Sequence, residues 1–367
     1  KITKKVGSGS TPKGGREVYT DKGIPFIRSQ NVNENRLILD KTHIPESIHN
    51  KMKGSVVFKD DILLNITGAS IGRSCVVPKS FKEGNVNQHV SIIRLEKDDP
   101  YFLHFFLTSF NGQKRIFQSM TGSGREGINF ENIRALKIFI PTTKEQQKIA
   151  NFLIQVDQKI ELLDKQQAAL EQYKKGVMQK IFNQEIRFKI VNEAGELVEP
   201  PEWEEKRLEE FLKIPTKKTP KNIETKKILT VKLHLNGIHL NERTDSLSIG
   251  STKYIVRREN QFIYGKQNLF NGALGIIPKK YDGYVSSGDV PTLDIDSKIT
   301  NVDFLFYYFS RKSYYKRLEN IASGSGSKRI HEETLLREKI SIPSMKEQTK
   351  IANFLTAIDT KIEAITK

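Results

Sequence analysis

Polar side chains interrupt the apolar runs of this chain in small clusters, and their types are those that hydrogen-bond to nucleic-acid bases. Arg and Lys match guanine, Asn and Gln match adenine, and Ser and Thr can match either. Any single member could be an ordinary solvated side chain, so the prediction rests on the clusters. The predicted DNA-contacting residues are Arg28, Ser29, Gln30, Asn31, Asn65, Thr67, Ser70, Arg73, Asn87, Gln88, His89, Arg125, Lys232, His234, Asn236, Lys266, Gln267, Asn268, Ser286, Ser287, Lys328 and Arg329.

The charge balance of the chain favours the same kind of ligand. Its 60 Lys and Arg residues against 43 Asp and Glu residues give a formal net charge of +17. A field of this size attracts polyanions. Nucleic acid is favoured over a membrane, because the chain has no basic amphipathic helix and no apolar run long enough to span a bilayer. The alternative is a protein that is basic without binding nucleic acid.

Motifs for catalysis are absent or poorly placed. The run GSGREG at 122–127 matches a dinucleotide-binding fingerprint, but a predicted helix precedes it and a strand-like run follows, the reverse of what that fingerprint requires. We interpret it as a glycine turn that presents Arg125. The run EEK at 204–206 resembles part of a nuclease site but lacks a well-placed upstream aspartate, and we predict a surface helix there. We find no phosphate-binding loop and no amino-methyltransferase motif, so we expect no catalysis by this chain alone.

Cysteine and histidine usage predicts neither a disulfide framework nor a metal site. The single cysteine, Cys75, stands in the apolar run RSCVV, and the seven histidines are scattered. A lone cysteine fits a reducing, cytoplasmic location. We expect no metal and no cofactor to be bound by this chain.

The chain contains an internal repeat. With an offset of 202 residues, 138–165 aligns with 340–367 without a gap, and 17 of the 28 pairs are identical. The match continues backwards through a glycine turn and then decays. Two copies of one unit with similar ends and different bodies are indicated. The bodies differ as two readers of different ligands would, and neutral drift after duplication is the alternative.

Each body combines short strands with one aromatic helix. Runs such as 61–66 and 227–233 are rich in Ile, Val and Leu and are bounded by turn residues. The aromatic helices, predicted at 101–120 and 302–318, are expected to face the core and not to stack on bases. The predicted fold is α+β, with two globular α/β units separated by long helices.

The repeated element itself is a helix with a coiled-coil seam. A capping box begins each copy directly after a proline, and 144–182 keeps a seven-residue apolar period that Gln167 and Lys174 interrupt. We predict that the two copies pair as an antiparallel coiled coil, with a pseudo-two-fold axis between the halves. Independent domains with a helical linker are the alternative. The predicted pairing residues are Ile149, Leu153, Val156, Ile160, Leu163, Leu170, Val177, Ile181, Ile351, Leu355, Ile358 and Ile362.

These features divide the chain into five segments. We predict a first recognition domain at 1–141, a central helix at 142–182, a linker at 183–199, a second recognition domain at 200–343, and a C-terminal helix at 344–367 that continues beyond the given sequence.

The repeated helix and the segment that follows its first copy resemble one known family. The pattern IPTTKEQQKIANFLIQVDQKIELLDKQQAALEQYKKGVMQKIF, followed by PPEWEEKRLEEFLK, is similar to the specificity subunit of Type I restriction-modification systems. The motif of Pro201, Glu202, Trp203 and Glu204 opens a target recognition domain in that family. The same motif is missing before the first body, so we expect the natural chain to extend ahead of Lys1.

The resemblance implies a non-catalytic DNA-binding subunit. Each recognition domain would read half of a bipartite, asymmetric double-stranded DNA target. The helices would set the spacer and dock two methyltransferase subunits, which methylate adenine N6. It also implies restriction subunits as partners, with S-adenosylmethionine, ATP and Mg²⁺ used by the partners. The alternatives are a stand-alone sequence-specific DNA-binding protein, a coiled-coil scaffold, or an enzyme with an unrecognised site.

Overall fold

The computed structural model of the chain describes residues 2–33, 35–120, 127–241, 252–324 and 326–366. The chain divides into two units, residues 1–162 and 163–367. This division falls inside the long helix predicted at 142–182, because the second half of that helix packs against the second unit. No helix in the described ranges is both long and apolar enough to cross a membrane.

The first unit is built on two four-stranded sheets, of order β1-β10-β7-β8 and β5-β2-β9-β6. The run Ile62–Asn65 of β7 is buried on both faces. Leu63 packs toward the second sheet, and Ile62 and Leu64 pack toward the helices. This two-sided burial explains why the strand is continuously apolar. The strands are β1 (Thr3–Ser8), β2 (Ile24–Ile27), β3 (Val32–Asn33), β4 (Arg36–Leu37), β5 (His43–Ile44), β6 (Val56–Val57), β7 (Ile62–Asn65), β8 (Ser74–Val76), β9 (Gly84–Val86) and β10 (Val90–Leu95).

The aromatic helix predicted at 101–120 is two shorter helices that face the core. Asp99 caps the first by accepting a hydrogen bond from the Phe102 backbone N–H, and Ser109 caps the second. Leu103 and Leu107 are buried against the sheet, as predicted for a core-facing stripe. The helices of this unit before the long one are α1 (Glu46–His49), α2 (Pro100–Thr108), α3 (Phe110–Gln118) and α4 (Phe130–Ala135).

The second unit repeats the main sheet of the first. Its order is β14-β21-β18-β19, and all three pairings are antiparallel. The aromatic helix predicted at 302–318 is again two shorter helices, α6 (Val302–Ser310) and α7 (Lys312–Arg317). From the matching strand order, β18 and β21 correspond to β7 and β10. The elements are β11 (Ile190–Val191), β12 (Leu197–Val198), β13 (Glu204–Arg207), β14 (Leu212–Lys213), β15 (Leu229–Val231), β16 (Ile238–Leu240), β17 (Tyr254–Val256), β18 (Phe262–Tyr264), β19 (Leu274–Ile276), β20 (Val285–Ser287), β21 (Thr292–Ile295), β22 (Lys339–Ile342), α6 (Val302–Ser310), α7 (Lys312–Arg317) and α8 (Glu332–Leu336).

The prediction of a surface helix at 204–206 is wrong, because these residues form β13. This strand pairs antiparallel with β22, with Glu205 opposite Ser341. On β22, Ile340 and Ile342 are both 2% exposed, and their burial needs a strand partner that completes the backbone hydrogen bonds. At the matching repeat positions of the first unit, residues 138–140 form no strand.

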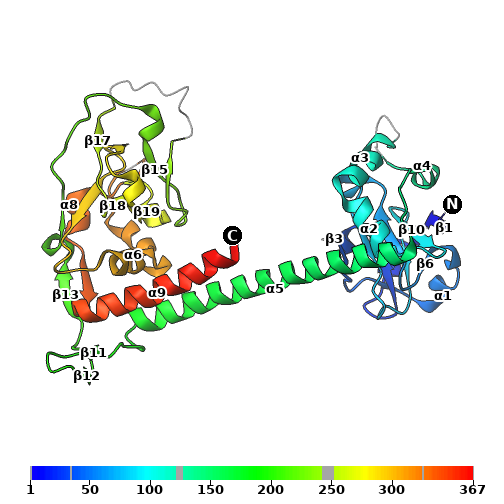
Figure 1. Ribbon diagram of the computed structural model, residues 1–367, viewed down its shortest axis with the longest axis horizontal. Helices are drawn as coiled ribbons and strands as arrows, with labels where there is room; N and C mark the ends of the chain where they lie inside the picture. The colour runs from blue at the N-terminus through cyan, green and yellow to red at the C-terminus, as the bar shows by residue number, and fades with distance from the viewer. Residues whose placement is uncertain (1, 34, 121–126, 242–251, 325, 367) are drawn as a thin grey trace. The chain divides into compact units, whose positions relative to one another are not determined.

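The long helix α5 (Thr143–Phe182) has 40 residues, and α9 (Met345–Thr366) has 22. Within the second unit α9 lies antiparallel to the end of α5, since Lys174 contacts Asp359 while Arg187, just past α5, contacts Glu347 (Figure 1). Val177 and Ile181 are buried there. The partners on α9, Ile351, Leu355 and Ile358, are also buried, and Ile362 is half-buried.

The earlier part of the predicted seam is more exposed. Ile149, Val156 and Ile160 are 37%, 39% and 52% exposed. Leu153, Leu163 and Leu170 are half-buried. With 22 residues, α9 is about 33 Å long and can cover only part of an α5 about 60 Å long.

One of the two polar interruptions of the seam makes an interhelical ion pair. Lys174 Nζ binds Asp359 Oδ1, and Asp359 Oδ2 accepts a hydrogen bond of 2.7 Å from the Tyr307 hydroxyl. The ammonium group also lies 5.1 Å from the centre of the Tyr307 ring. Gln167 instead bonds within its own helix, to Glu171. Lys174 is thus the interruption that can specify helix register.

We expect charge reversal at this pair to weaken the second unit and the swapped pair to restore it. Lys174→Glu places two carboxylates together and should lower the free energy of unfolding by about 1–2 kcal/mol, since the pair is only partly buried. Lys174→Glu with Asp359→Lys should recover most of that loss. Urea denaturation followed by Trp203 fluorescence measures it, and equal loss in the single and double variants would contradict the register role.

Candidate nucleic-acid interface

In the first unit the predicted polar clusters come together where β7 ends and β10 begins. Asn65, the last residue of β7, is fully buried. Its side-chain amide donates to the Ser29 carbonyl at 2.9 Å and to Ser70 Oγ at 3.1 Å. Asn65 therefore holds two loops, 28–31 and 66–73, at the same end of the sheet. We call the predicted residues at this end of the first unit the reading cluster. They are Arg28, Ser29, Gln30, Asn31, Asn65, Thr67, Ser70, Arg73, Asn87, Gln88 and His89.

The start of β10 adds a second set of side chains to the reading cluster. Thr67 Oγ1 and His89 Nδ1 are 2.6 Å apart, and Gln88 Nε2 lies 3.2 Å from His89 Nε2. Thr11 Oγ1 donates to Gln88 Oε1 at 2.5 Å. Asn87 is 7% exposed and its side chain accepts from the His89 N–H. Gln88 is exposed and is held from both sides, as a base-reading amide needs to be.

An aspartate outside the predicted set orients the 28–31 loop. Asp40 Oδ2 accepts hydrogen bonds of 2.8 Å from both Arg28 Nη2 and Gln30 Nε2. Burial alone would raise the pKa of Asp40, but hydrogen bonds from Thr42, Gln30 and Arg28 bring that pKa well below its usual range. Asp40 is consequently charged at neutral pH and holds both side chains in place.

The members of the reading cluster differ in exposure. Asn31, Asn65 and Asn87 are buried, so they support the loops and do not fit their prediction as DNA contacts. Gln30, Arg73 and Gln88 are exposed, and Arg73 Nη1 donates to Asn33 Oδ1 at 2.9 Å. Asn31 is 2% exposed and bonds the backbone of Arg28 and Ile38. Arg125 lies outside the described residues.

In the second unit one predicted cluster occupies the hairpin between β15 and β16. Lys232, His234 and Asn236 are all exposed there. His234 has a φ of 58°, in the left-handed region, and its N–H donates to the carbonyl of Asn271 at 2.9 Å. This bond attaches the hairpin to the turn that contains Asn268, so two predicted clusters adjoin.

The turn after β18 contacts residues 329–332, which follow the second glycine turn. Lys266 Nζ lies 2.8 Å from Glu332 Oε2, and Arg329 Nη1 lies 3.1 Å from Asp289 Oδ1. Gln267, with its amide in the orientation that satisfies its neighbours, accepts from Arg329 Nη2 at 2.8 Å. Lys328 pairs with Glu319 at 2.8 Å on the surface.

Ser286 does not fit its prediction as a DNA contact. It is fully buried, its hydroxyl donates to the Val290 carbonyl, and it accepts from Arg257 Nε at 2.7 Å. Burial lowers the pKa of Arg257 to about 10, and the hydroxyls and carbonyls around it satisfy its donors. Ser287 is half-buried, and its carbonyl accepts from the same guanidinium. These serines support the interior of the unit.

The described residues contain no group of three or more His, Cys, Asp or Glu that could hold a metal ion. Cys75 is fully buried, and burial raises the pKa of its thiol to about 12, which removes it as a nucleophile at neutral pH.

Sequence reasoning missed the partners that hold the predicted residues. Asp40, Asn33 and Thr11 orient members of the reading cluster, and Glu332 and Asp289 do so in the second unit. Each lies at least ten residues from the side chain it binds. No local pattern marks such a pair, because only the folded sheet brings the loops together.

Comparison with known proteins identifies what the repeated scaffold is similar to. The family model described as "Type I restriction modification DNA specificity domain" matches twice, at residues 3–172 and 200–367. A putative type I restriction enzyme MjaX specificity subunit of Methanocaldococcus jannaschii is 28% identical over 364 residues, covering 93% of this chain and 81% of the relative. The MjaVIII specificity subunit of the same organism is 25% identical, covering 85% and 75%.

Solved structures share the fold. The S subunit of a Type-I restriction-modification system from M. genitalium superposes with a TM-score of 0.56 at 16% identity, covering 99% of this chain and 88% of that one. A chain from a structure of type I R-M complex assembly and conformational transition gives a TM-score of 0.52 at 14% identity, covering 99% and 89%. At these identities the likeness concerns the fold alone.

Proposed function

We propose, from the premise that this chain belongs to the Type I restriction-modification DNA specificity family, that each of its two units reads one half of a bipartite DNA target. The observation that carries the proposal is one scaffold with two different sets of polar residues. After β7 stand Thr67 and Ser70, and after the corresponding β18 stand Lys266, Gln267 and Asn268. Side chains at equivalent positions but of different hydrogen-bonding type would select different bases.

The remaining parts of the proposal concern partners. As a specificity subunit the chain would act without catalysis of its own, beside two methyltransferase subunits and the restriction subunits. S-adenosylmethionine, ATP and Mg²⁺ would be bound by those partners. The net charge of +17 supports the DNA contact. Co-purification with a subunit that binds S-adenosylmethionine separates this proposal from a stand-alone DNA-binding protein.

The first test changes the exposed readers of one unit only. Gln88→Ala and Arg73→Ala should each relax the preference at one or two base pairs of one half-site, by about 1–3 kcal/mol, while the other half-site stays unchanged. The measurement is a map of N6-methylated adenines in DNA from cells that express the whole complex. Lys97→Ala, at an exposed lysine just past the opposite end of β10, is a suitable control. Changes in both half-sites would contradict one-unit, one-half reading.

A second test addresses the role of α5 as a spacer. Inserting four helix-forming residues next to Gln167 lengthens the helix by about 6 Å, which corresponds to nearly two base pairs. The preferred spacer should therefore grow by one or two base pairs while both half-sites are retained. The same methylation map measures the spacer, and an unchanged spacer would show that α5 does not set it.

A further inference from the structure

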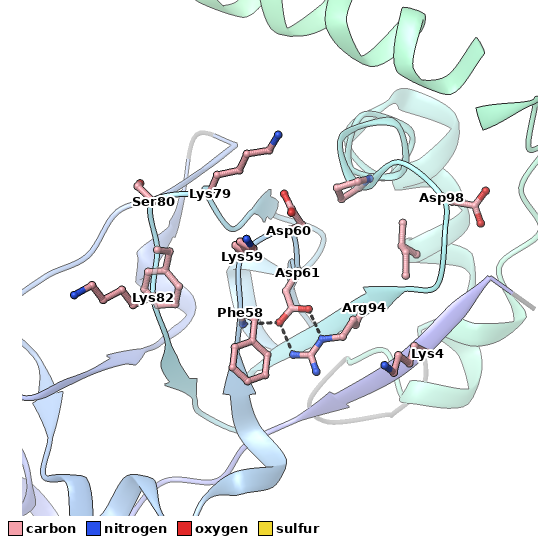
Figure 2. A pocket seen from close by; sticks show the side chains of 13 residues that line it. Lys4, Phe58, Lys59, Asp60, Asp61, Lys79, Ser80, Lys82, Arg94 and Asp98 are labelled. Carbon is pink, nitrogen blue, oxygen red and sulfur yellow. Dashed lines mark hydrogen bonds and ion pairs between the residues drawn. The ribbon is translucent and has the colours of Figure 1, made fainter. Parts of the chain in front are cut away.

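A basic cavity lies at the other end of the strands that carry the reading cluster. It has a volume of about 770 Å³ (Figure 2). Its lining includes Asp61, which directly precedes β7, and Leu95, the last residue of β10. Its size is in the range of small-molecule pockets. Since β7 separates it from Asn65 by the length of the strand, about 13 Å, it is distinct from the reading cluster.

The floor of the cavity is an internally satisfied ion pair beside an aromatic ring. Arg94 binds Asp61 through two hydrogen bonds of 2.7 Å, from Nε and Nη2, and Asp61 is 1% exposed. The Phe58 N–H also donates to Asp61 at 2.8 Å, and the Arg94 guanidinium lies 4.8 Å from the centre of the Phe58 ring. Phe58 itself is 44% exposed, so part of its ring is open to a ligand.

The rim of the cavity carries exposed lysines that form no ion pair among the described residues. Lys4, Lys59, Lys79 and Lys82 line it and are exposed, and within the described ranges none of them has an ion-pair partner. Figure 2 shows Lys4 and Lys59 on either side of the Asp61–Arg94 pair. Two further carboxylates, Asp60 and Asp98, also line the cavity. The lining nevertheless remains positive overall, because the lysines and Arg94 outnumber its aspartates.

The second unit shows that the fold does not need the Asp61–Arg94 ion pair. In place of the Asp61–Arg94 ion pair, the second unit has a hydrogen bond between a neutral amide and a carboxylate. Gln261 Nε2 donates to Asp294 Oδ1 at 2.6 Å. An aspartate therefore stands in β21 where β10 has Arg94. The Asp61–Arg94 ion pair is a property of the first unit and not of the shared scaffold.

We propose that this cavity binds a nucleotide phosphate group, with the open part of the Phe58 ring against the base or sugar and the rim lysines on the phosphate oxygens. The ligand is either a free nucleoside triphosphate or a nucleotide within a DNA strand. Both present the same chemistry to the site. The proposal is independent of half-site reading, because it concerns the other end of the sheet.

Reversing two rim charges tests the proposal. The double variant Lys4→Glu/Lys59→Glu is compared with Lys22→Glu/Lys51→Glu, which changes the net charge equally at exposed lysines that do not line the cavity. The probes are ATP, by calorimetry, and a 20-base-pair duplex without the target sequence, by fluorescence anisotropy at low salt. The cavity variant should weaken binding of at least one probe by about tenfold or more relative to the control variant.

The outcomes separate the two sources and can overturn the proposal. Loss of ATP binding identifies a free nucleotide, and loss of duplex binding alone identifies the DNA backbone. Equal effects of the two double variants on both probes, with unchanged thermal unfolding, would refute the site. A result of that kind would leave half-site reading untouched, because methylation maps of the variants report that function separately.

Discussion

Glu347→Ala is expected to lower the free energy of unfolding of the second unit by about 3 kcal/mol, whereas Glu145→Ala should cost less than about 1 kcal/mol. The two glutamates occupy the same position of the repeat, three residues after the cap of each helix copy. Glu347 is fully buried. Its carboxylate accepts from Arg187 Nε at 2.9 Å and Nη2 at 3.0 Å, and from the Phe188 N–H at 3.1 Å.

Removing this carboxylate leaves the Phe188 N–H without its acceptor and leaves the half-buried Arg187 guanidinium with only the Pro201 carbonyl as a close acceptor, which is the costly way to break a buried pair. Glu145 is exposed, and in the part of the chain that the structure describes it has no ion-pair partner. Only its favourable interaction with the helix N-terminus would be lost.

Trp203 makes the measurement selective. It is the only tryptophan of the chain and packs edge-on against Phe182 in the core of the second unit. Urea denaturation followed by its fluorescence therefore reports the unfolding of that unit. Glu347→Gln retains an acceptor for Phe188 and should lose less than Glu347→Ala. Equal effects of the alanine substitutions at 145 and 347 would contradict the difference in burial.

These two glutamates also mark the limit of what the sequence predicts. The repeat, the bounds of the two repeated helices and the core-facing aromatic stripes follow from local spacing, and the structure agrees with them, although each aromatic helix is divided in two. Capping-box spacing is identical in both copies, however, and cannot indicate that Arg187, 160 residues from Glu347, covers one glutamate and not the other. The strand at 204–207 was missed for the same reason, because its partner lies at 339–342.

The candidate site shows the same division between local and long-range information. Residue type and clustering located the loops around Asn65 and Gln88, which the fold does bring together. Exposure was not predictable, because it depends on which strand packs over each side chain. Ser286 and the exposed Gln88 both belong to short polar runs in the sequence, yet the first is buried beneath Arg257.

The residue after each glutamate leads to the opposite expectation, because Gln146 and Gln348 have equivalent surroundings. Each is 1% exposed. Gln146 accepts from the Asp99 N–H at 2.8 Å and donates to Asp98 and to the Pro141 carbonyl. Gln348 accepts from the Asn301 N–H at 2.8 Å and donates to the Ile299 and Pro343 carbonyls. In both units this glutamine joins the start of the repeated helix to the start of the aromatic helix.

Gln146→Leu and Gln348→Leu should therefore each destabilise their own unit by about 3–4 kcal/mol, since several buried backbone groups lose their partners at once. Hydrogen exchange measured by mass spectrometry can follow the two units separately. Faster exchange at the starts of α2 and α5 is expected for Gln146→Leu, and at the starts of α6 and α9 for Gln348→Leu. Because this contact directly links a recognition body to the helix proposed to set the spacer, each variant should also broaden the spacer preference while leaving half-site bases unchanged. A variant that unfolds less readily than expected and keeps a sharp spacer would show that other contacts align the helix with the body.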